Sequence, residues 1–187
     1  SGAVAAAVYV THKVLPLDHE HFGFLPRQTL LASESFHDHA ETFSQAVPSL
    51  ACVCVPFAPD SNLVCLAINP RGNRDVATAN AFVHRLYQDL CAYPTQPLQA
   101  KSFFGSITSL RPEALGQSHM RRILEKLGLD PATLANDDED HDRLFILRHT
   151  LMNPYIIDHE NDINYAQRYF AYLQQRLHAL IGPTHAG

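Results

Sequence analysis

The stretch Ala51–Asn69 reads ACVCVPFAPDSNLVCLAIN and decides the fold. It contains two strand-length apolar runs, Ala51–Phe57 and Leu63–Asn69, which are rich in Val, Ile and Cys. The five residues between them, Ala58–Asn62, include Pro, Asp, Ser and Asn, which are typical of turns. Because so short a connection leaves no room for a crossover, the stretch predicts a β-hairpin of two antiparallel neighbours.

Helical and strand-like patterns alternate on both sides of this hairpin. Apolar spacings of three and four residues predict helices at Phe24–Ala46, Val76–Leu90, Pro112–Gly128 and Asn161–Ile181, and apolar runs predict strands at Lys101–Leu110 and Arg143–Met152. Gly105 inside the first of these strands indicates a close approach of backbones or a bulge. This order of elements predicts an α+β domain in which helices cover one face of a four-stranded, mostly antiparallel sheet.

The first residues are more apolar than an exposed terminal helix should be. The segment Ala3–Val14 has a helical pattern, and it begins without a methionine or a polar lead-in. We interpret this start as a cut from something larger. Exposed apolar surface on this helix and on the sheet predicts association into a dimer or a tetramer.

Composition excludes several classes of protein. The formal net charge is −5 and no run rich in Lys or Arg occurs, which argues against nucleic acid as a partner. No run of about 18 apolar residues is present, so no membrane span is expected, and the N-terminus is a poor signal peptide. The cysteines, which are Cys52, Cys54, Cys65 and Cys91, form no Cys-x-x-Cys pair. Reduced thiols in a cytoplasmic protein are the favoured interpretation.

Histidine is frequent, with 12 residues, and suggests a metal site as one hypothesis. In His19-Glu20-His21 and His37-Asp38-His39 the two imidazoles are two residues apart and point in different directions on a helix, whereas zinc sites on helices favour a spacing of four. Solvated surface histidines are therefore the favoured interpretation. The acidic cluster Asp137–Asp140 lacks the alternation of a calcium loop and is interpreted as a solvated loop. No nucleophile elbow or phosphate-binding loop is present.

Several motifs, in order along the chain, carry a resemblance to a known family. They are the segment Ala6–Leu17, the tripeptide His21-Phe22-Gly23, the hairpin residues Pro59–Val64 with Asn69–Asn73, and the final-strand motif Leu147–Tyr155 (LRHTLMNPY). Together they resemble the C-terminal third of group II pyridoxal-phosphate (PLP) dependent amino-acid decarboxylases, especially the bacterial tyrosine/glutamate decarboxylase-like branch. The similarity covers nearly the whole chain, and the final motif is its most specific part. Tyr9 stands where that family usually has Trp.

This resemblance implies a division of the chain and of the chemistry. Residues 1–48 would link from a PLP-binding large domain, and residues 49–187 would form the small C-terminal α+β domain of a fold-type-I enzyme. The Schiff-base lysine of the family, in an Asp-x-His-Lys motif, would lie upstream, as would the cofactor. The resemblance therefore implies an L-amino-acid decarboxylase that is a cytoplasmic homodimer, of which this segment, inactive alone, closes the substrate pocket. It does not indicate which amino acid is the substrate.

The same resemblance yields three candidate residues for the substrate pocket: Thr150, Arg148 and His149. Thr150 falls where the family places a Ser or Thr near the substrate, although a strand threonine equally often satisfies a neighbouring backbone group. Arg148 has the planar fork that pairs with a carboxylate, although structural ion pairs are common. Asn153-Pro154-Tyr155 is expected to fix the turn after the strand.

Two other functions stay open on the sequence. Four-stranded α+β domains often stand alone as modules that bind a ligand or a protein, and a histidine-based metal protein is the third hypothesis. Lys13, in Thr11-His12-Lys13, lacks the preceding aspartate of a PLP lysine and is interpreted as a residue at a helix end.

Overall fold

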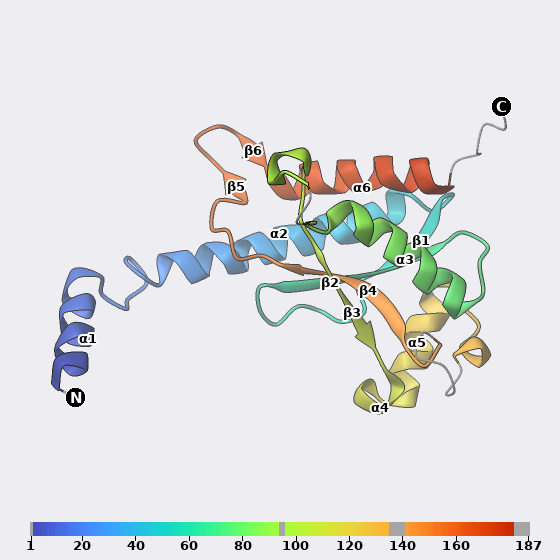
Figure 1. Cartoon of the computed structure of the whole chain (residues 1–187), viewed down its shortest axis with the longest axis horizontal. Helices are drawn as coiled ribbons and strands as arrows, with labels where there is room; N and C mark the ends of the chain where they lie inside the picture. The colour runs from blue at the N-terminus through green and yellow to red at the C-terminus, as the bar shows by residue number, and fades with distance from the viewer. Residues whose placement is uncertain (1, 94–95, 135–140, 182–187) are drawn as a thin grey trace.

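A four-stranded antiparallel sheet forms the centre of the computed structural model (Figure 1), which describes residues 2–93, 96–134 and 141–181. The helices are α1 (Gly2–Val14), α2 (Phe24–Ala46), α3 (Val76–Leu90), α4 (Pro112–Leu115), α5 (Gln117–Lys126) and α6 (Tyr165–Ile181), with short 3-10 turns at 98–100 and 131–133. The strands are β1 (Ala51–Cys54), β2 (Leu63–Pro70), β3 (Ser106–Leu110), β4 (Leu144–Thr150), β5 (Ile157–Asp158) and β6 (Ile163–Asn164).

The strand order in the sheet is β1-β2-β4-β3, and every neighbouring pair is antiparallel. The predicted hairpin is confirmed, with Ala51 opposite Pro70 and Cys54 opposite Ala67. The central strands are the most buried, because Leu66, Ile68 and Leu147 have no exposed surface. Strands β2 and β4 are thus the ones on which the rest of the domain is built.

Alternate residues of the central strands enter two different cores. Val64, Leu66 and Ile68 of β2 pack in a larger core with α2, α3 and α6. Cys65 and Ala67, which point the other way, pack in a smaller core with α5 and the start of α3. The predicted α+β class and its helix-covered sheet are confirmed, and α5 adds a second helical layer on the opposite face.

Local chemistry explains where the elements differ from the predicted ranges. The helix expected at Pro112–Gly128 is divided at Gly116, whose φ of 82° lies in the left-handed region and interrupts the helical turn. The strand expected from Lys101 begins only at Ser106. The last helix begins at Tyr165 and not at Asn161, because Ile163–Asn164 form a strand that pairs with Ile157–Asp158 in the small β5–β6 hairpin. Residues 136–140 of the expected acidic loop lie outside the described residues.

Helix α1 has no buried residue and projects from the body of the domain together with the start of α2 (Figure 1). Twelve of the eighteen exposed large hydrophobic side chains of the described chain lie between residues 4 and 31. This surface agrees with the apolar pattern seen in the sequence, and its predicted role in association stays a prediction. No helix in the described ranges is both long and apolar enough to cross a membrane.

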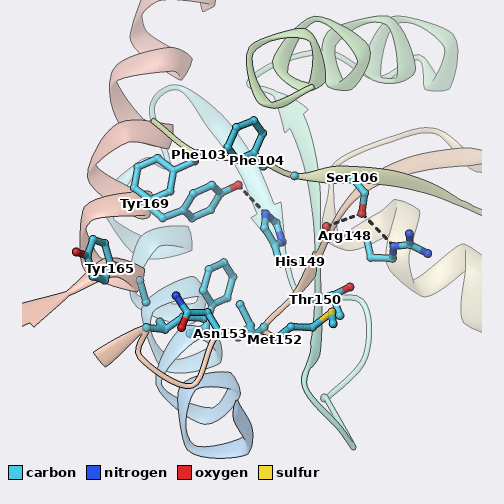
Figure 2. A pocket seen from close by; sticks show the side chains of 15 residues that line it. Phe103, Phe104, Ser106, Arg148, His149, Thr150, Met152, Asn153, Tyr165 and Tyr169 are labelled. Atoms are coloured by element: carbon cyan, nitrogen blue, oxygen red, sulfur yellow. Dashed lines mark hydrogen bonds between the residues drawn. The ribbon is translucent and has the colours of Figure 1, made fainter. Parts of the chain in front are cut away.

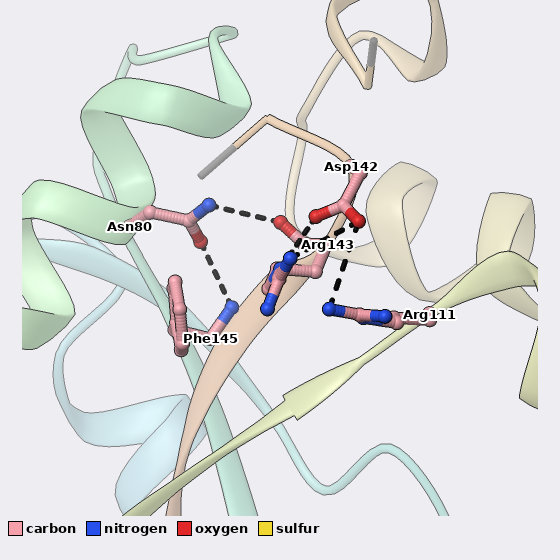
Figure 3. A network of polar contacts seen from close by, with 5 residues as sticks. All are labelled: Asn80, Arg111, Asp142, Arg143 and Phe145. Atoms are coloured by element: carbon pink, nitrogen blue, oxygen red, sulfur yellow. Dashed lines mark hydrogen bonds and ion pairs between the residues drawn. The ribbon is translucent and has the colours of Figure 1, made fainter. Parts of the chain in front are cut away.

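A buried asparagine ties α3 to the start of β4 (Figure 3). The Asn80 side-chain amide donates to the carbonyl oxygen of Arg143 over 2.9 Å, and its oxygen accepts from the N–H of Phe145, also over 2.9 Å. Beside them, Asp142 binds Arg143 and lies 3.8 Å from the Arg111 guanidinium. The asparagine thus satisfies two backbone groups where β4 enters the sheet.

Replacing this side chain should weaken the whole domain. We expect Asn80→Ala to lower the free energy of unfolding by about 2–3 kcal/mol, because the half-buried N–H of Phe145 and carbonyl of Arg143 both lose their hydrogen bond to the buried amide. Urea unfolding followed by circular dichroism measures the change. Gln88→Ala, at an exposed position of the same helix, is the control and should change stability by less than about 0.5 kcal/mol. Equal stability of the two variants would contradict this account of Asn80.

Candidate functional site

A cavity of about 370 Å³ lies where β3 begins and β4 ends. Helices α2 and α6 and the segment after β4 complete its wall (Figure 2). Its lining combines aromatic and aliphatic side chains with a few polar groups, and consists of Phe36, Phe103, Phe104, Gly105, Ser106, Arg148, His149, Thr150, Leu151, Met152, Asn153, Ile156, Tyr165, Ala166 and Tyr169. An apolar hollow with a few polar groups is the usual form of a small-molecule site.

The inner wall of the cavity is aromatic. Phe36 on α2 contacts the ring of His149 with a centroid distance of 4.9 Å. Phe103 meets Tyr169 edge to face at 5.4 Å. Phe104, beside it, is 52% exposed. The wall therefore offers ring edges and faces to a flat apolar group.

A buried hydrogen-bonded pair, His149 and Tyr169, forms the floor (Figure 2). Nε2 of His149 lies 2.6 Å from the Tyr169 hydroxyl, and Nδ1 lies 3.2 Å from the carbonyl oxygen of Val64. Since a carbonyl only accepts, Nδ1 carries the proton of the neutral ring, and the Tyr169 hydroxyl donates to Nε2. Burial lowers the pKa of His149 to about 4 and raises the pKa of Tyr169 above its ordinary value. Both side chains are therefore neutral near pH 7.

Arg148 is held by Ser106 of the neighbouring strand. The Ser106 hydroxyl donates to the carbonyl oxygen of Arg148 over 3.0 Å and accepts from its Nε over 3.1 Å. Gly105 lets β3 start this close to α3, because a Cβ there would lie 3.1 Å from a methyl carbon of Leu90. These two hydrogen bonds hold the carbonyl oxygen and Nε of Arg148, and they fix the direction in which the outer nitrogens of the guanidinium point.

The structure brings the three sequence-predicted residues to one cavity, on one strand. Arg148 and Thr150 are exposed and His149 between them is buried. Thr150 lies opposite Leu63 in the ladder with β2. Whether the three residues contact a substrate stays a prediction. Asn153 accepts a hydrogen bond from the N–H of Tyr155 at 2.9 Å, which agrees with the expected turn after the strand.

Several lining residues were missed from the sequence. The apolar pattern predicts only a strand at Phe103, Phe104 and Ser106, and only a helix at Tyr165 and Tyr169. Tyr169 departs from the aliphatic stripe of α6, and a buried tyrosine usually has a polar partner, but the sequence alone does not identify that partner. Only the fold places α6 against the end of β4.

The histidine-rich segments pair with carboxylates locally. Nδ1 of His21 lies 2.7 Å from Asp18, and Nε2 of His37 lies 3.9 Å from Glu41. Within the described ranges no three His, Cys, Asp or Glu side chains gather in a way that would hold a metal ion. The four cysteines are free thiols, of which Cys65 is buried.

Comparison with known proteins gives consistent results. A family model described as "Tyrosine decarboxylase, C-terminal" matches residues 32–177. An L-tyrosine decarboxylase of Enterococcus faecalis is 28% identical over 181 residues, which are 95% of this chain and 28% of the relative. L-tyrosine decarboxylases of Enterococcus faecium and Levilactobacillus brevis are each 25% identical, over 97% and 90% of this chain and 29% and 26% of theirs. The chain spans little more than a quarter of the length of these curated relatives.

The buried imidazole predicts a loss of stability in mild acid. The pKa of His149 is about 4 in the folded protein and lies below the ordinary value of 6.5. Between pH 4 and pH 6.5, the unfolded chain therefore binds a proton that the folded chain does not. Stability is therefore lost as the pH falls from 6.5 through 4, by on the order of 3 kcal/mol for this group. We expect urea unfolding at pH 7 and pH 4 to show a smaller fall for His149→Gln than for the wild type.

The control for this experiment is His119→Gln, which removes an exposed imidazole from α5. Its pH dependence should match that of the wild type. If His149→Gln lost as much stability in acid as the wild type does, the buried neutral state of His149 would be wrong.

Proposed function

Since the chain belongs to the family of tyrosine decarboxylase C-terminal regions, we propose that it is the C-terminal part of a PLP-dependent decarboxylase. The whole enzyme would release CO2 from an L-amino acid and leave an amine. This part would shape the substrate pocket and the subunit interface. The observation that carries the proposal is the meeting of Arg148, His149 and Thr150 with an aromatic wall at one cavity.

Each part of the cavity has chemistry that suits an amino acid. The guanidinium of Arg148, oriented by Ser106, would bind a carboxylate through its outer N–H groups. The Thr150 hydroxyl would donate to or accept from the polar end of the substrate. The aromatic wall would take the side chain and exclude water from it.

The relatives and the lining together favour an aromatic substrate. The three relatives are named L-tyrosine decarboxylases, and Phe103, Phe104 and Tyr165 line the cavity. Aromatic pairs gain about 0.5–1.5 kcal/mol beyond the area they bury. We therefore propose L-tyrosine, or a closely related aromatic amino acid, as the substrate.

The cofactor does not fit this chain alone. PLP enzymes hold the cofactor on a lysine and use it to withdraw electrons. The three lysines here lie elsewhere: Lys13 is exposed on α1, Lys126 is exposed on α5, and Nζ of Lys101 donates to the carbonyl oxygen of Gln88 over 3.1 Å. None of them lines the cavity. In our proposal PLP is bound by the remainder of the enzyme, and this chain supplies none of its anchors.

The subunit interface is part of the same proposal. Helix α1 leaves all its apolar side chains exposed, including Val4, Val8 and Val14. Contiguous apolar surface of this kind usually lies against another protein surface. We propose a cytoplasmic homodimer in which α1 is covered.

The carboxylate-binding role of Arg148 is tested on the full-length enzyme. We expect release of CO2 from L-tyrosine, and a fall in kcat/KM of roughly 10- to 100-fold in Arg148→Gln, because charge-assisted hydrogen bonds to the substrate are lost. The control is Arg121→Gln, which breaks an exposed ion pair with Glu125 on α5 and should leave kcat/KM unchanged. Full-length enzyme that releases CO2 from no member of a panel of L-amino acids would refute the proposed function.

The missing cofactor anchor is tested on the 187-residue chain. Incubated with PLP and passed through a desalting column, this chain should keep no visible absorbance of bound cofactor and release no CO2, whereas the full-length enzyme should do both. Stable absorbance that disappears in Lys101→Arg or Lys13→Arg would show that the chain anchors the cofactor itself.

A further inference from the structure

The pair formed by Tyr169 and His149 has no part in the proposed chemistry so far, although it lies directly beneath the cavity. The Tyr169 hydroxyl and Nε2 of His149 are 2.6 Å apart, and the two residues are 4% and 7% exposed. Both rings line the cavity, but they are almost fully buried and their polar atoms bind each other. The position of His149 in β4, between Arg148 and Thr150, suggests another role for the pair.

The end of β4 is supported on one side only. The ladder between β3 and β4 ends at Ser106 opposite Arg148, whereas the ladder with β2 continues to Thr150 opposite Leu63. Beyond Arg148 the strand therefore depends on β2 and on its own side chains for its direction. His149, which is buried and packs on Phe36 of the larger core, enters the interior at this point.

The ring of His149 is held from three directions. Its Nδ1 donates to Val64 on β2, its Nε2 accepts from Tyr169 on α6, and its face packs on Phe36 of α2. Tyr169 is itself held by Phe103, edge to face at 5.4 Å. Because Arg148 and Thr150 flank His149 in the chain, fixing its ring also fixes the directions in which these two residues leave the strand.

We propose that Tyr169, acting through His149, is a positioning residue that holds Arg148 and Thr150 in their substrate-binding directions. This inference rests on the proposed function. The Tyr169 hydroxyl acts as a fixed donor on α6, to which the strand end is attached through the imidazole. Losing the hydroxyl removes one of the three contacts that hold the imidazole, and the two flanking side chains are then held less firmly in their common direction.

The test compares two identical changes on one helix of the full-length enzyme. Tyr169→Phe removes only the hydroxyl that donates to His149. Tyr172→Phe, one turn further along α6, removes a hydroxyl from a ring that also packs on Phe103, at 5.4 Å, but does not line the cavity. We expect Tyr169→Phe to raise KM for the amino acid about tenfold, in line with one neutral hydrogen bond, with a smaller change in kcat. Tyr172→Phe should leave KM unchanged.

A second variant separates positioning from stability. In His149→Phe/Tyr169→Phe both partners become apolar rings of similar shape, which usually restores much of the stability lost in the single variant. We expect its thermal stability to recover relative to Tyr169→Phe while KM stays about tenfold raised. Recovery of KM together with stability would show that the pair is only structural and would overturn the inference.

The outcomes distinguish this inference from the proposed function. A wild-type enzyme that decarboxylates no L-amino acid refutes the proposed function, and the inference falls with it. An active wild type whose KM is the same in Tyr169→Phe overturns the inference alone. An equal rise of KM in Tyr172→Phe would overturn it as well, because the effect would then belong to the helix and not to the bond with His149.

Discussion

The pairing of β2 with β4 is the interaction on which the rest of the structure depends. These strands are not neighbours in the sequence, yet they lie side by side in the centre of the sheet, with Leu66 opposite Leu147. Both residues are fully buried. Removing either strand would expose two cores at once, because alternate residues of β2 enter different helical layers. At about 25 cal/mol per Å² of buried apolar surface, the nearly fully buried residues of β2 contribute more each than the half-buried residues of the edge strand β1.

Strand β4 changes its surroundings along its length, and this change creates the site. Leu144, Ile146 and Leu147 lie in the core with almost no exposed surface. Beyond Arg148 the ladder with β3 has ended and alternate side chains are exposed. A strand that is rigid in its first half can present polar side chains from its second half at defined positions. The cavity therefore lies where packing gives way to solvent, which is a common place for a binding site on a rigid scaffold.

Local sequence signals predicted most of the elements but not the wall of the cavity. The hairpin at Ala51–Asn69 and the helix Val76–Leu90 follow from apolar spacing and turn residues within one segment, and both are confirmed. The division at Gly116 was missed because a single glycine inside a helical pattern is often tolerated, whereas Gly116 ends α4 and α5 begins after it. The short β5–β6 hairpin was missed because two-residue strands leave no periodic pattern. Arg148, His149 and Thr150 came from a family motif, whereas Tyr169 and Phe103 lie near them only because of tertiary packing.

The distribution of burial divides the chain into a part that closes its own cores and a part whose apolar side chains stay exposed. Its buried apolar residues after position 32 form two cores around the sheet, and Phe36, Ala166 and Tyr169 of the cavity lining belong to the larger one. Its exposed large apolar side chains are concentrated before that position, on α1, on the segment that joins it to α2 and on the first turns of α2. A binding surface must be rigid to bind through fixed groups, because groups ordered only on binding cost affinity. A part that folds around its own cores satisfies this requirement. In the proposed decarboxylase, the electron-withdrawing chemistry would come from a cofactor held by the rest of the enzyme.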